Sequence, residues 1–211
     1  IIADENIPEV KKIKKISIKK NINLSLIHNE SNGIQLLTHR FEKEKQILEI
    51  KFKKAKYKIY LNLIGKIQVK NILMAIIAAN NSGIEFKKIL KILPRITSVE
   101  GRLEKIGKIH NNSKVILDYA HTPAAPESAL SNLKEQFPFN KIILIFGCGG
   151  DRDLKKRPLM GRIAEKYSNE IYLTDDNPRN EKPFKIRNEI KKGIKNLSLI
   201  HISEPTRRDQ I

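Results

Sequence analysis

The sequence predicts an α/β protein with two parts, a β-rich segment that ends in helices and a doubly wound, Rossmann-like domain. Three observations support this class. Apolar and polar residues alternate between Lys15 and Ile64, the spacing becomes helical after Gly65, and short apolar runs alternate with helical segments beyond Gly101. Alternation with a period of two is typical of half-buried strands, and strands separated by helices are typical of parallel sheets.

The first part is predicted to contain antiparallel strands. Apolar and polar residues alternate in the runs 48–53 and 57–63, as they do when one face of a strand is buried. The dipeptide Asn32-Gly33 stands between apolar stretches and predicts a hairpin turn, because both residues tolerate the positive φ that such turns need.

Two helices are predicted after these strands. The first has an apolar face that begins at Ile72, and it ends near Ser82-Gly83. The second extends from about Glu85 to Leu93 and is stopped by Pro94, since a residue before proline disfavours the helical conformation.

The domain boundary is predicted in the segment 94–101, which gives a first domain of residues 1–97 and a second of 98–196. Residues 197–211 do not read as a continuation of the second domain and are predicted to be a non-native tail. The chain opens with Ile1 and with residues typical of a domain interior, so it is expected to be a piece of a longer protein.

Three short apolar runs in the second domain, 115–117, 142–146 and 171–173, are predicted to be buried parallel strands. Each is followed by a helix that begins near a proline. Two of these helices carry apolar stripes that are assigned to the core: Leu159, Met160, Ile163, Ala164 and Tyr167 on one, and Ile186, Ile190 and Ile194 on the other.

Composition argues against nucleic-acid-binding, disulfide-rich and membrane proteins. There are 41 Lys and Arg against 23 Asp and Glu, but the lysines are scattered and no aromatic residues interleave with them. A coding bias therefore fits better than a nucleic-acid-binding patch, although the charge suits anionic substrates. One cysteine, Cys148, excludes an internal disulfide framework, and no apolar run approaches the roughly 18 residues of a membrane span. A cytoplasmic protein with no nucleic-acid or membrane partner is expected.

Polar loops follow the three predicted parallel strands, at Asp118–Pro123, Gly147–Asp153 and Thr174–Arg179. Ligands bind at the carboxyl ends of strands in open parallel sheets, so these loops are expected to converge on one crevice. Their carboxylates would hold a ligand ammonium and their arginines a ligand carboxylate. The loops therefore suit a zwitterionic ligand.

Other kinds of site have less support. The glycines at 147, 149 and 150 lack GxGxxG spacing, and no GxxxxGK[ST] phosphate loop occurs. The histidines and Cys148 lack the spacing of zinc ligands, so no metal ligand is assigned. Cys148 has no histidine paired with it in sequence and is not expected to be a nucleophile. Of the histidines, only His121 shares a loop with a carboxylate.

Five ordered motifs resemble the Mur ligase family, and within it the ligases that add meso-diaminopimelate. They are Gly65–Asn71, Glu100–Glu104, Asp118–Pro123, Phe146–Gly161 and Thr174–Arg179. The resemblance extends from about Leu63 to Gly193. It implies that residues 1–97 are the latter part of the family's central ATPase domain and that residues 98–196 are an incomplete ligase domain.

The resemblance implies a monomeric, cytoplasmic ligase of peptidoglycan precursor synthesis. In this family ATP, with Mg²⁺, phosphorylates the glutamyl carboxylate of a UDP-N-acetylmuramoyl dipeptide, and the amine of diaminopimelate attacks the acyl phosphate. By the same resemblance Asn71, Arg102 and Asp118 contact ATP, and His121 beside them is the candidate catalytic residue. The phosphate loop and the Mg²⁺ ligands would lie outside this chain, which alone is expected to be inactive.

Diaminopimelate binding is assigned, also by resemblance, to Arg152, Asp176, Asn177 and Arg179. Diaminopimelate has a distal carboxylate that lysine lacks. Arg179 can pair with it, whereas lysine would leave a partly buried guanidinium without a partner. The alternatives are a lysine-adding Mur ligase, a folylpolyglutamate-type ligase and, from another class, a basic nucleic-acid-binding module.

The chain departs from the family pattern at Gln68, at Leu154-Lys155 and at Pro126, none of which is assigned to diaminopimelate. Pro126 is expected to distort the helix that follows His121, because its ring removes a helical hydrogen bond.

Overall fold

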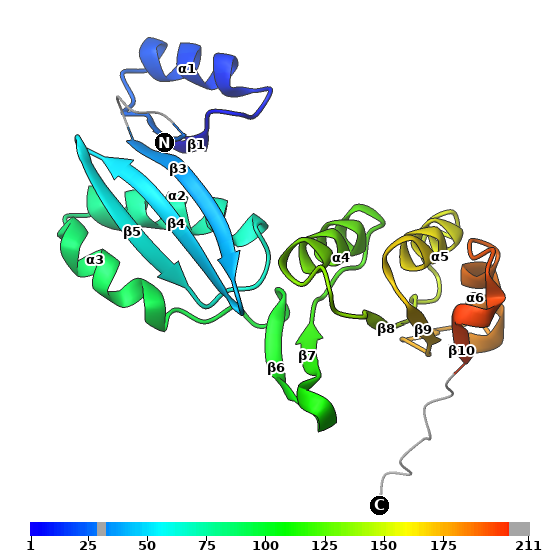
Figure 1. Cartoon of the computed structure of the whole chain (residues 1–211). Helices are drawn as coiled ribbons and strands as arrows, with labels where there is room; N and C mark the ends of the chain where they lie inside the picture. Colours follow the sequence, from blue (N-terminus) through cyan, green and yellow to red (C-terminus); the bar gives the residue numbers. More distant parts are fainter. Residues whose placement is uncertain (29–32, 203–211) are drawn as a thin grey trace, which may run out of the picture. The chain divides into compact units, whose positions relative to one another are not determined.

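The computed structural model describes residues 1–28 and 33–202. The chain separates into two compact units, Ile1–Leu117 and Asp118–Ile211, each with its own hydrophobic core (Figure 1). The division falls later than the boundary predicted at 97/98. One reason is that Lys105, which lies beyond that boundary, pairs with Glu44 of the first unit at 2.6 Å.

The first unit is built on a mixed five-stranded sheet in the order β1–β2–β3–β4–β5. The strands are β1 (Ile2–Asp4), β2 (Ser25–Ile27), β3 (Gly33–Glu42), β4 (Lys45–Phe52) and β5 (Ala55–Leu61). The antiparallel arrangement predicted from residue alternation is confirmed for β3, β4 and β5. It is wrong for β2, which runs parallel to β3 and to β1.

The strands predicted from Lys15 onward begin later, because helix α1 occupies Val10–Lys19. Alternation at Ile16 and Ile18 is misleading there. Ile18 is 81% exposed, whereas Ser17 is the buried residue of the helix. Buried and exposed residues therefore do not alternate in this segment.

The predicted hairpin at Asn32-Gly33 is not formed by the strands on either side, since β2 and β3 are parallel. Asn32 itself lies outside the described residues. The hairpins are instead closed by Lys43-Glu44 and Lys53-Lys54. Lys43, Lys53 and Lys54 all adopt positive φ, which two-residue hairpin turns require even where the residues are not glycine.

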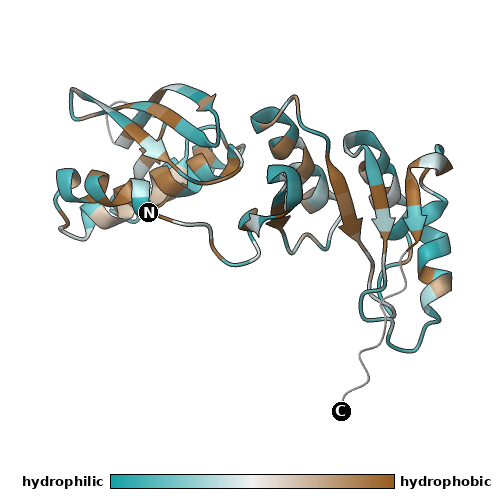
Figure 2. Ribbon diagram, turned by 60° about the horizontal axis from the view of Figure 1, so that its bottom comes forward, coloured by the Kyte–Doolittle hydropathy of each residue, from teal (hydrophilic) through white to brown (hydrophobic). Residues whose placement is uncertain are grey.

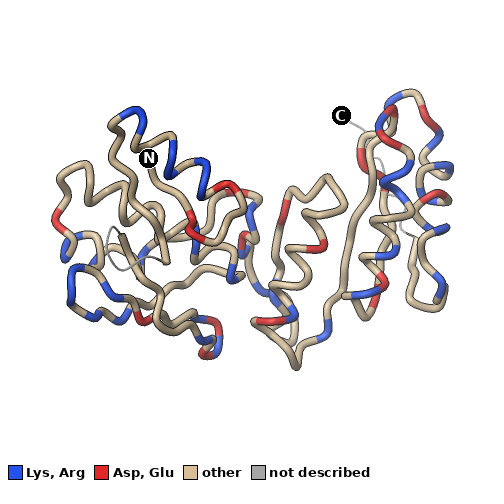
Figure 3. The backbone as a smooth tube through the Cα atoms, turned by 90° about the horizontal axis from the view of Figure 1, so that it is seen from above, with Lys and Arg blue, Asp and Glu red and all other residues tan. Residues whose placement is uncertain are grey.

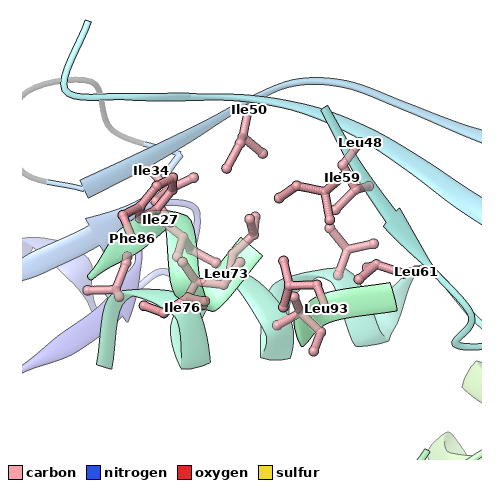
Figure 4. Packing of buried hydrophobic residues seen from close by; sticks show 14 of the residues in the cluster. Ile27, Ile34, Leu48, Ile50, Ile59, Leu61, Leu73, Ile76, Phe86 and Leu93 are labelled. Carbon is pink, nitrogen blue, oxygen red and sulfur yellow. The ribbon is translucent and has the colours of Figure 1, made fainter. Parts of the chain in front are cut away.

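Two helices pack on one face of this sheet (Figure 1). They are α2 (Ile67–Asn81) and α3 (Phe86–Ile92), and the short helix η1 (Leu93–Arg95) follows. Both predicted helices are confirmed, and Pro94 lies in η1 as the stop after α3. Figure 4 shows isoleucines and leucines of the strands meeting Leu73 and Ile76 of α2. This packing fixes the start of α2, where the motif 65–71 lies.

The second unit has a parallel sheet in the order β10–β9–β8. Its elements are α4 (Ala124–Gln136), β8 (Ile143–Phe146), α5 (Lys156–Tyr167), β9 (Glu170–Leu173), α6 (Pro183–Lys191), η3 (Leu197–Leu199) and β10 (Ile200–Ile202). Strand β8 is brown in Figure 2, because all four of its residues are apolar. The α/β class with a parallel sheet is therefore confirmed.

One predicted parallel strand belongs elsewhere. Strand β7 (Lys114–Leu117) pairs antiparallel with β6 (Glu104–Lys108), and the two form a separate sheet. The third parallel strand is β10, whose residues pair with Ile171–Leu173. This strand lies within residues 197–211, and the assignment of that segment to a non-native tail stays a prediction. Residues 203–211 lie outside the described part of the chain.

Pro126 does not break helix α4, contrary to the expected distortion. It is the third residue of a helix that continues to Gln136. The first N–H groups of a helix have no acceptor within it, so a proline there removes no helical hydrogen bond.

The buried face of α5 also differs from the predicted stripe. Leu159 is 41% exposed, whereas Arg157 is fully buried beside Met160, Gly161 and Ala164. The stripe on α6 is confirmed by buried Ile186 and Ile190. None of the helices in residues 1–28 and 33–202 has the length and hydrophobicity needed to cross a bilayer.

Candidate functional site

The loops that follow β8 and β9 lie against each other. The backbone N–H of Gly150 donates to the carbonyl of Asn177 at 2.8 Å, and Arg179 Nη1 donates to the carbonyl of Gly150 at 2.6 Å. A Cβ on Gly150 would lie 1.8 Å from the Pro178 carbonyl oxygen. Only glycine permits this approach, and the predicted convergence is confirmed for these two loops.

A second set of contacts joins the residues next to the two predicted arginines. Asp151, which precedes Arg152, accepts a hydrogen bond at Oδ2 from Asn180 Nδ2 at 2.8 Å. Asn180 follows Arg179 directly. The backbone N–H of Asp151 also donates to Glu181 Oε1 at 2.7 Å. The backbones that carry Arg152 and Arg179 are therefore neighbours at the edge of one sheet.

Both arginines have donors available. Arg179 has positive φ, and its backbone N–H donates to Asn177 Oδ1 at 3.1 Å. Within residues 1–28 and 33–202 its guanidinium bonds only to the Gly150 carbonyl. The Arg152 side chain is exposed and has no hydrogen bond or ion pair with any described residue. Asp176 and Asn177 are also exposed. The four residues assigned to diaminopimelate thus occupy two joined loops.

A buried arginine lies beneath these loops. The Arg157 side chain is 0% exposed, and it pairs with Glu181 and with Glu189 at 2.7 Å each. Its Nη2 also donates to the Gly149 carbonyl at 3.1 Å. These charge-assisted bonds raise the pKa of Arg157 above its ordinary value, with the bond to Glu181 contributing most. The network ties the glycine loop to the loop after β9 and to α6.

This network keeps Glu181 ionised at a lower pH than an ordinary glutamate. Its bond to Arg157, together with the N–H of Asp151, holds the pKa of Glu181 down to about 2. A carboxylate with a lowered pKa stabilises the fold fully above its ordinary pKa and loses that contribution as the pH falls. The contribution of Glu181 should therefore disappear between about pH 4.5 and pH 2.

At neutral pH Glu181→Gln should lower the urea midpoint of the second unit, because it removes a partner of a buried cation. The difference between wild type and variant should shrink as the pH falls from 4.5 to 2, where the native carboxylate also becomes protonated. Urea titrations at a series of pH values measure this. A constant difference across that range would contradict the assigned pairing.

Asp175, in the same loop as Asp176, has a structural role. It pairs with Arg187 of α6, which is itself buried. Asp175 is therefore committed to holding the loop on α6, whereas the exposed Asp176 is available to a ligand ammonium.

His121 lies on the loop that opens the second unit. Its Nδ1 is 3.1 Å from the Tyr119 carbonyl and donates to it, because a carbonyl oxygen can only accept. Lys156 Nζ donates to the His121 carbonyl at 3.0 Å and ties this loop to the start of α5. Asp118 is partly buried in the same loop.

The residues assigned to ATP fall in both units. In the first, Asn71 Nδ2 donates to Gln68 Oε1 at 3.2 Å, and Gln68 Nε2 donates to the Arg102 carbonyl at 3.4 Å. Asn71 and Arg102 are thus brought together by Gln68, the residue at which the chain departs from the family pattern. Asp118 belongs to the second unit.

A buried amide fixes the turn before α2. Gln46 is 0% exposed, and its Nε2 donates to the carbonyls of Leu63 and Gly65 at 2.9 and 3.1 Å. Its Oε1 is 2.8 Å from His39 Nε2, which must be the donor because the amide nitrogen is already used. Gly65 has φ +88°, so this turn needs glycine.

No group of three or more side chains able to hold a metal ion occurs in the described ranges. A hollow of 1040 Å³ opens on the first unit, and its lining includes Lys14, Ile18, Leu24 and Asn81. None of the predicted site residues lines it. The residues assigned to diaminopimelate instead lie on two exposed loops of the second unit.

Sequence reasoning missed the ion pairs of Arg157 and the contact from Lys156 to the His121 loop. One signal was available for the first. Residues 157, 160, 161 and 164 share one helical face, so a charged residue at 157 stands on an otherwise apolar stripe. Such a position requires a buried partner.

Several known proteins are similar to this chain. A family model described as "Mur ligase, glutamate ligase domain" matches residues 101–209. UDP-N-acetylmuramoyl-L-alanyl-D-glutamate--2,6-diaminopimelate ligase of Rickettsia felis is 34% identical over 203 residues, which cover 96% of this chain and 37% of that protein. The protein of the same name from Buchnera aphidicola is 47% identical over 140 residues, 66% of this chain and 27% of that protein.

Solved structures show the same fold. A UDP-N-acetylmuramoyl-L-alanyl-D-glutamate--2,6-diaminopimelate ligase matches with a TM-score of 0.67 at 26% identity, over 96% of this chain and 42% of that one. Folylpolyglutamate synthase of Mycobacterium tuberculosis, complexed with ADP, has a TM-score of 0.72 at 20% identity, over 96% and 45%. The chain spans about two fifths of the length of the Rickettsia relatives that it matches.

Proposed function

Because the chain belongs to the Mur ligase family, we propose that it forms part of an ATP-dependent ligase that joins meso-2,6-diaminopimelate to UDP-N-acetylmuramoyl-L-alanyl-D-glutamate. The activity is proposed for the whole enzyme, of which this chain is about two fifths by comparison with its relatives. A monomeric enzyme of the cytoplasm, acting in peptidoglycan precursor synthesis, fits this role. Residues 1–97 would belong to the central ATPase domain and 98–196 to the ligase domain.

The observation that carries the proposal is the pair of arginines on two joined loops. Arg179 retains donors beyond its bond to Gly150, and Arg152 is exposed on the neighbouring loop. A guanidinium can bind a carboxylate with two parallel hydrogen bonds. Diaminopimelate has two carboxylates, so two guanidiniums at one rim match it better than they match lysine. Asp176 and Asn177 would take its ammonium groups.

Asn71, Arg102 and Asp118 are the residues proposed to contact ATP. Asn71 and Arg102, joined through Gln68, would contact the nucleotide. Asp118 is also assigned to ATP, and His121 in the same loop is the proposed catalytic residue. The described residues offer no cluster for Mg²⁺. No step of the reaction is therefore assigned to a metal held by this chain.

A turnover assay tests the proposed function. ADP release by the complete ligase should require both the UDP-linked dipeptide and diaminopimelate, and lysine should not replace the diaminopimelate. The 211-residue chain alone should release none. Turnover with lysine in place of diaminopimelate would favour a lysine-adding ligase, and turnover with a folate and glutamate would favour a folylpolyglutamate-type enzyme.

The basic composition does not favour a nucleic-acid-binding module. Lys and Arg occur along both units and are interspersed with Asp and Glu (Figure 3). Nucleic-acid-binding surfaces instead concentrate positive charge on one face or along one groove.

A further inference from the structure

Arg157 is an unusual residue for the core of the second unit. Its side chain is fully buried, and its two terminal nitrogens make four hydrogen bonds, while its Nε has no partner among the described residues. Burying a guanidinium is costly even when it is paired, and an apolar side chain of similar size often serves the fold as well. The fold alone therefore does not explain the arginine.

The bonds of Arg157 reach both loops of the candidate site. Nη2 donates to the Gly149 carbonyl in the glycine loop, and both terminal nitrogens donate to Glu181 in the loop after β9. Glu181 in turn accepts the backbone N–H of Asp151 at 2.7 Å. The pair thus bridges one loop to the other directly below the positions of Arg152 and Arg179.

We propose that Arg157 and Glu181 are positioning residues for the amino-acid substrate: they hold the loop that carries Arg179 at a fixed distance from the loop that carries Arg152. This inference rests on the proposed function, because it takes the two exposed guanidiniums as the groups that bind the substrate carboxylates. A planar guanidinium bonded to a carboxylate in two places also fixes relative orientation, which a single hydrogen bond does not.

Glu189 provides a matched control within the same network. Its carboxylate also pairs with Arg157 at 2.7 Å, but it lies on α6, and among the described residues it has no hydrogen bond or ion pair with either loop. Losing Glu189 should therefore destabilise the buried Arg157 without freeing the loops that carry Arg152 and Arg179. Losing Glu181 should do both. The comparison separates a positioning role from a role in stability alone.

Three variants of the complete ligase test the proposal: Glu181→Gln, Glu189→Gln and the double variant Arg157→Met with Glu181→Gln. The double variant replaces both members of the ion pair between Arg157 and Glu181. Neither of these two charges is therefore left buried without the other. In Glu181→Gln and in the double variant, KM for diaminopimelate should rise about tenfold or more, because small displacements of binding groups are costly. KM for ATP should stay within about twofold, as should KM for diaminopimelate in Glu189→Gln.

The kinetic results distinguish a positioning role from a role in stability alone. Unchanged KM for diaminopimelate in the double variant, or an equal rise in Glu189→Gln, would overturn the positioning role. If the double variant does not fold, Glu181→Gln decides by the same comparison, and failure of both to fold would show a role in stability only. A wild-type ligase without diaminopimelate-dependent turnover would instead count against the proposed function.

Discussion

Replacing Arg179 with alanine in the complete ligase is expected to raise KM for diaminopimelate about a hundredfold. The change removes a charged hydrogen-bond donor, whose bonds contribute about 1.5–3 kcal/mol each, and tenfold in affinity corresponds to about 1.4 kcal/mol. KM for ATP should change by no more than about twofold, because the residues assigned to ATP lie elsewhere. Steady-state kinetics with each substrate varied in turn measure the two constants.

A conservative variant isolates the role of the planar group. Arg179→Lys keeps the positive charge and can still donate to the Gly150 carbonyl, but it cannot form two parallel bonds to a carboxylate. Its KM for diaminopimelate should fall between those of wild type and Arg179→Ala. Equal effects of Arg179→Ala on diaminopimelate and ATP would show that the residue acts on the fold and not on the substrate.

Gly150→Ala is expected to force the two site loops apart. The new Cβ would lie 1.8 Å from the carbonyl oxygen and 2.5 Å from the carbonyl carbon of Pro178, and both are backbone atoms that cannot rotate away. The second unit should lose about 1–3 kcal/mol of stability, as in other overpacked sites. The hydrogen bonds from Gly150 to Asn177 and from Arg179 to Gly150 should be lost with it, so KM for diaminopimelate should rise by at least about tenfold.

Gly107→Ala is the matched control for this variant. Gly107 lies in β6 of the first unit, and a Cβ there would meet nothing within 4 Å. Alanine should therefore leave both stability and KM nearly unchanged, within about 0.5 kcal/mol for stability. Urea denaturation and the kinetic assay, applied to both variants, test the contrast. If Gly150→Ala behaved like Gly107→Ala, the loops would not be packed as described.

Individual strands and helices could be predicted where the local pattern of apolar residues was strong. The alternation at 57–63 identified β5 and its core residues Ile59 and Leu61, because burial of one face leaves a period of two in the sequence. The same rule failed at α1, where Ile16 and Ile18 alternate by coincidence on a mostly exposed helix. Strand β10 was missed because only its pairing with β9 makes it a strand.

The site could be predicted to a similar extent. The loops after β8 and β9 follow apolar runs, so their meeting at one sheet edge was visible from sequence. The ion pairs beneath them were not, because Arg157 lies 24 residues from Glu181 and 32 from Glu189. Such distant pairing depends on how α5 and α6 pack. The lone charge on an apolar helical face indicated only that some partner existed.

The buried amide of Gln46 gives the turn before α2 a different response to acid from that of the loops that carry Arg152 and Arg179. An amide has no proton to lose or gain in this range, and His39 donates from Nε2 whether or not its ring is charged. The Gly65 turn therefore keeps its anchors in acid, while the rim that holds Arg152 and Arg179 depends on the ionised Glu181. As the pH falls, the affinity for diaminopimelate should therefore decrease, while the turn before α2 keeps its conformation.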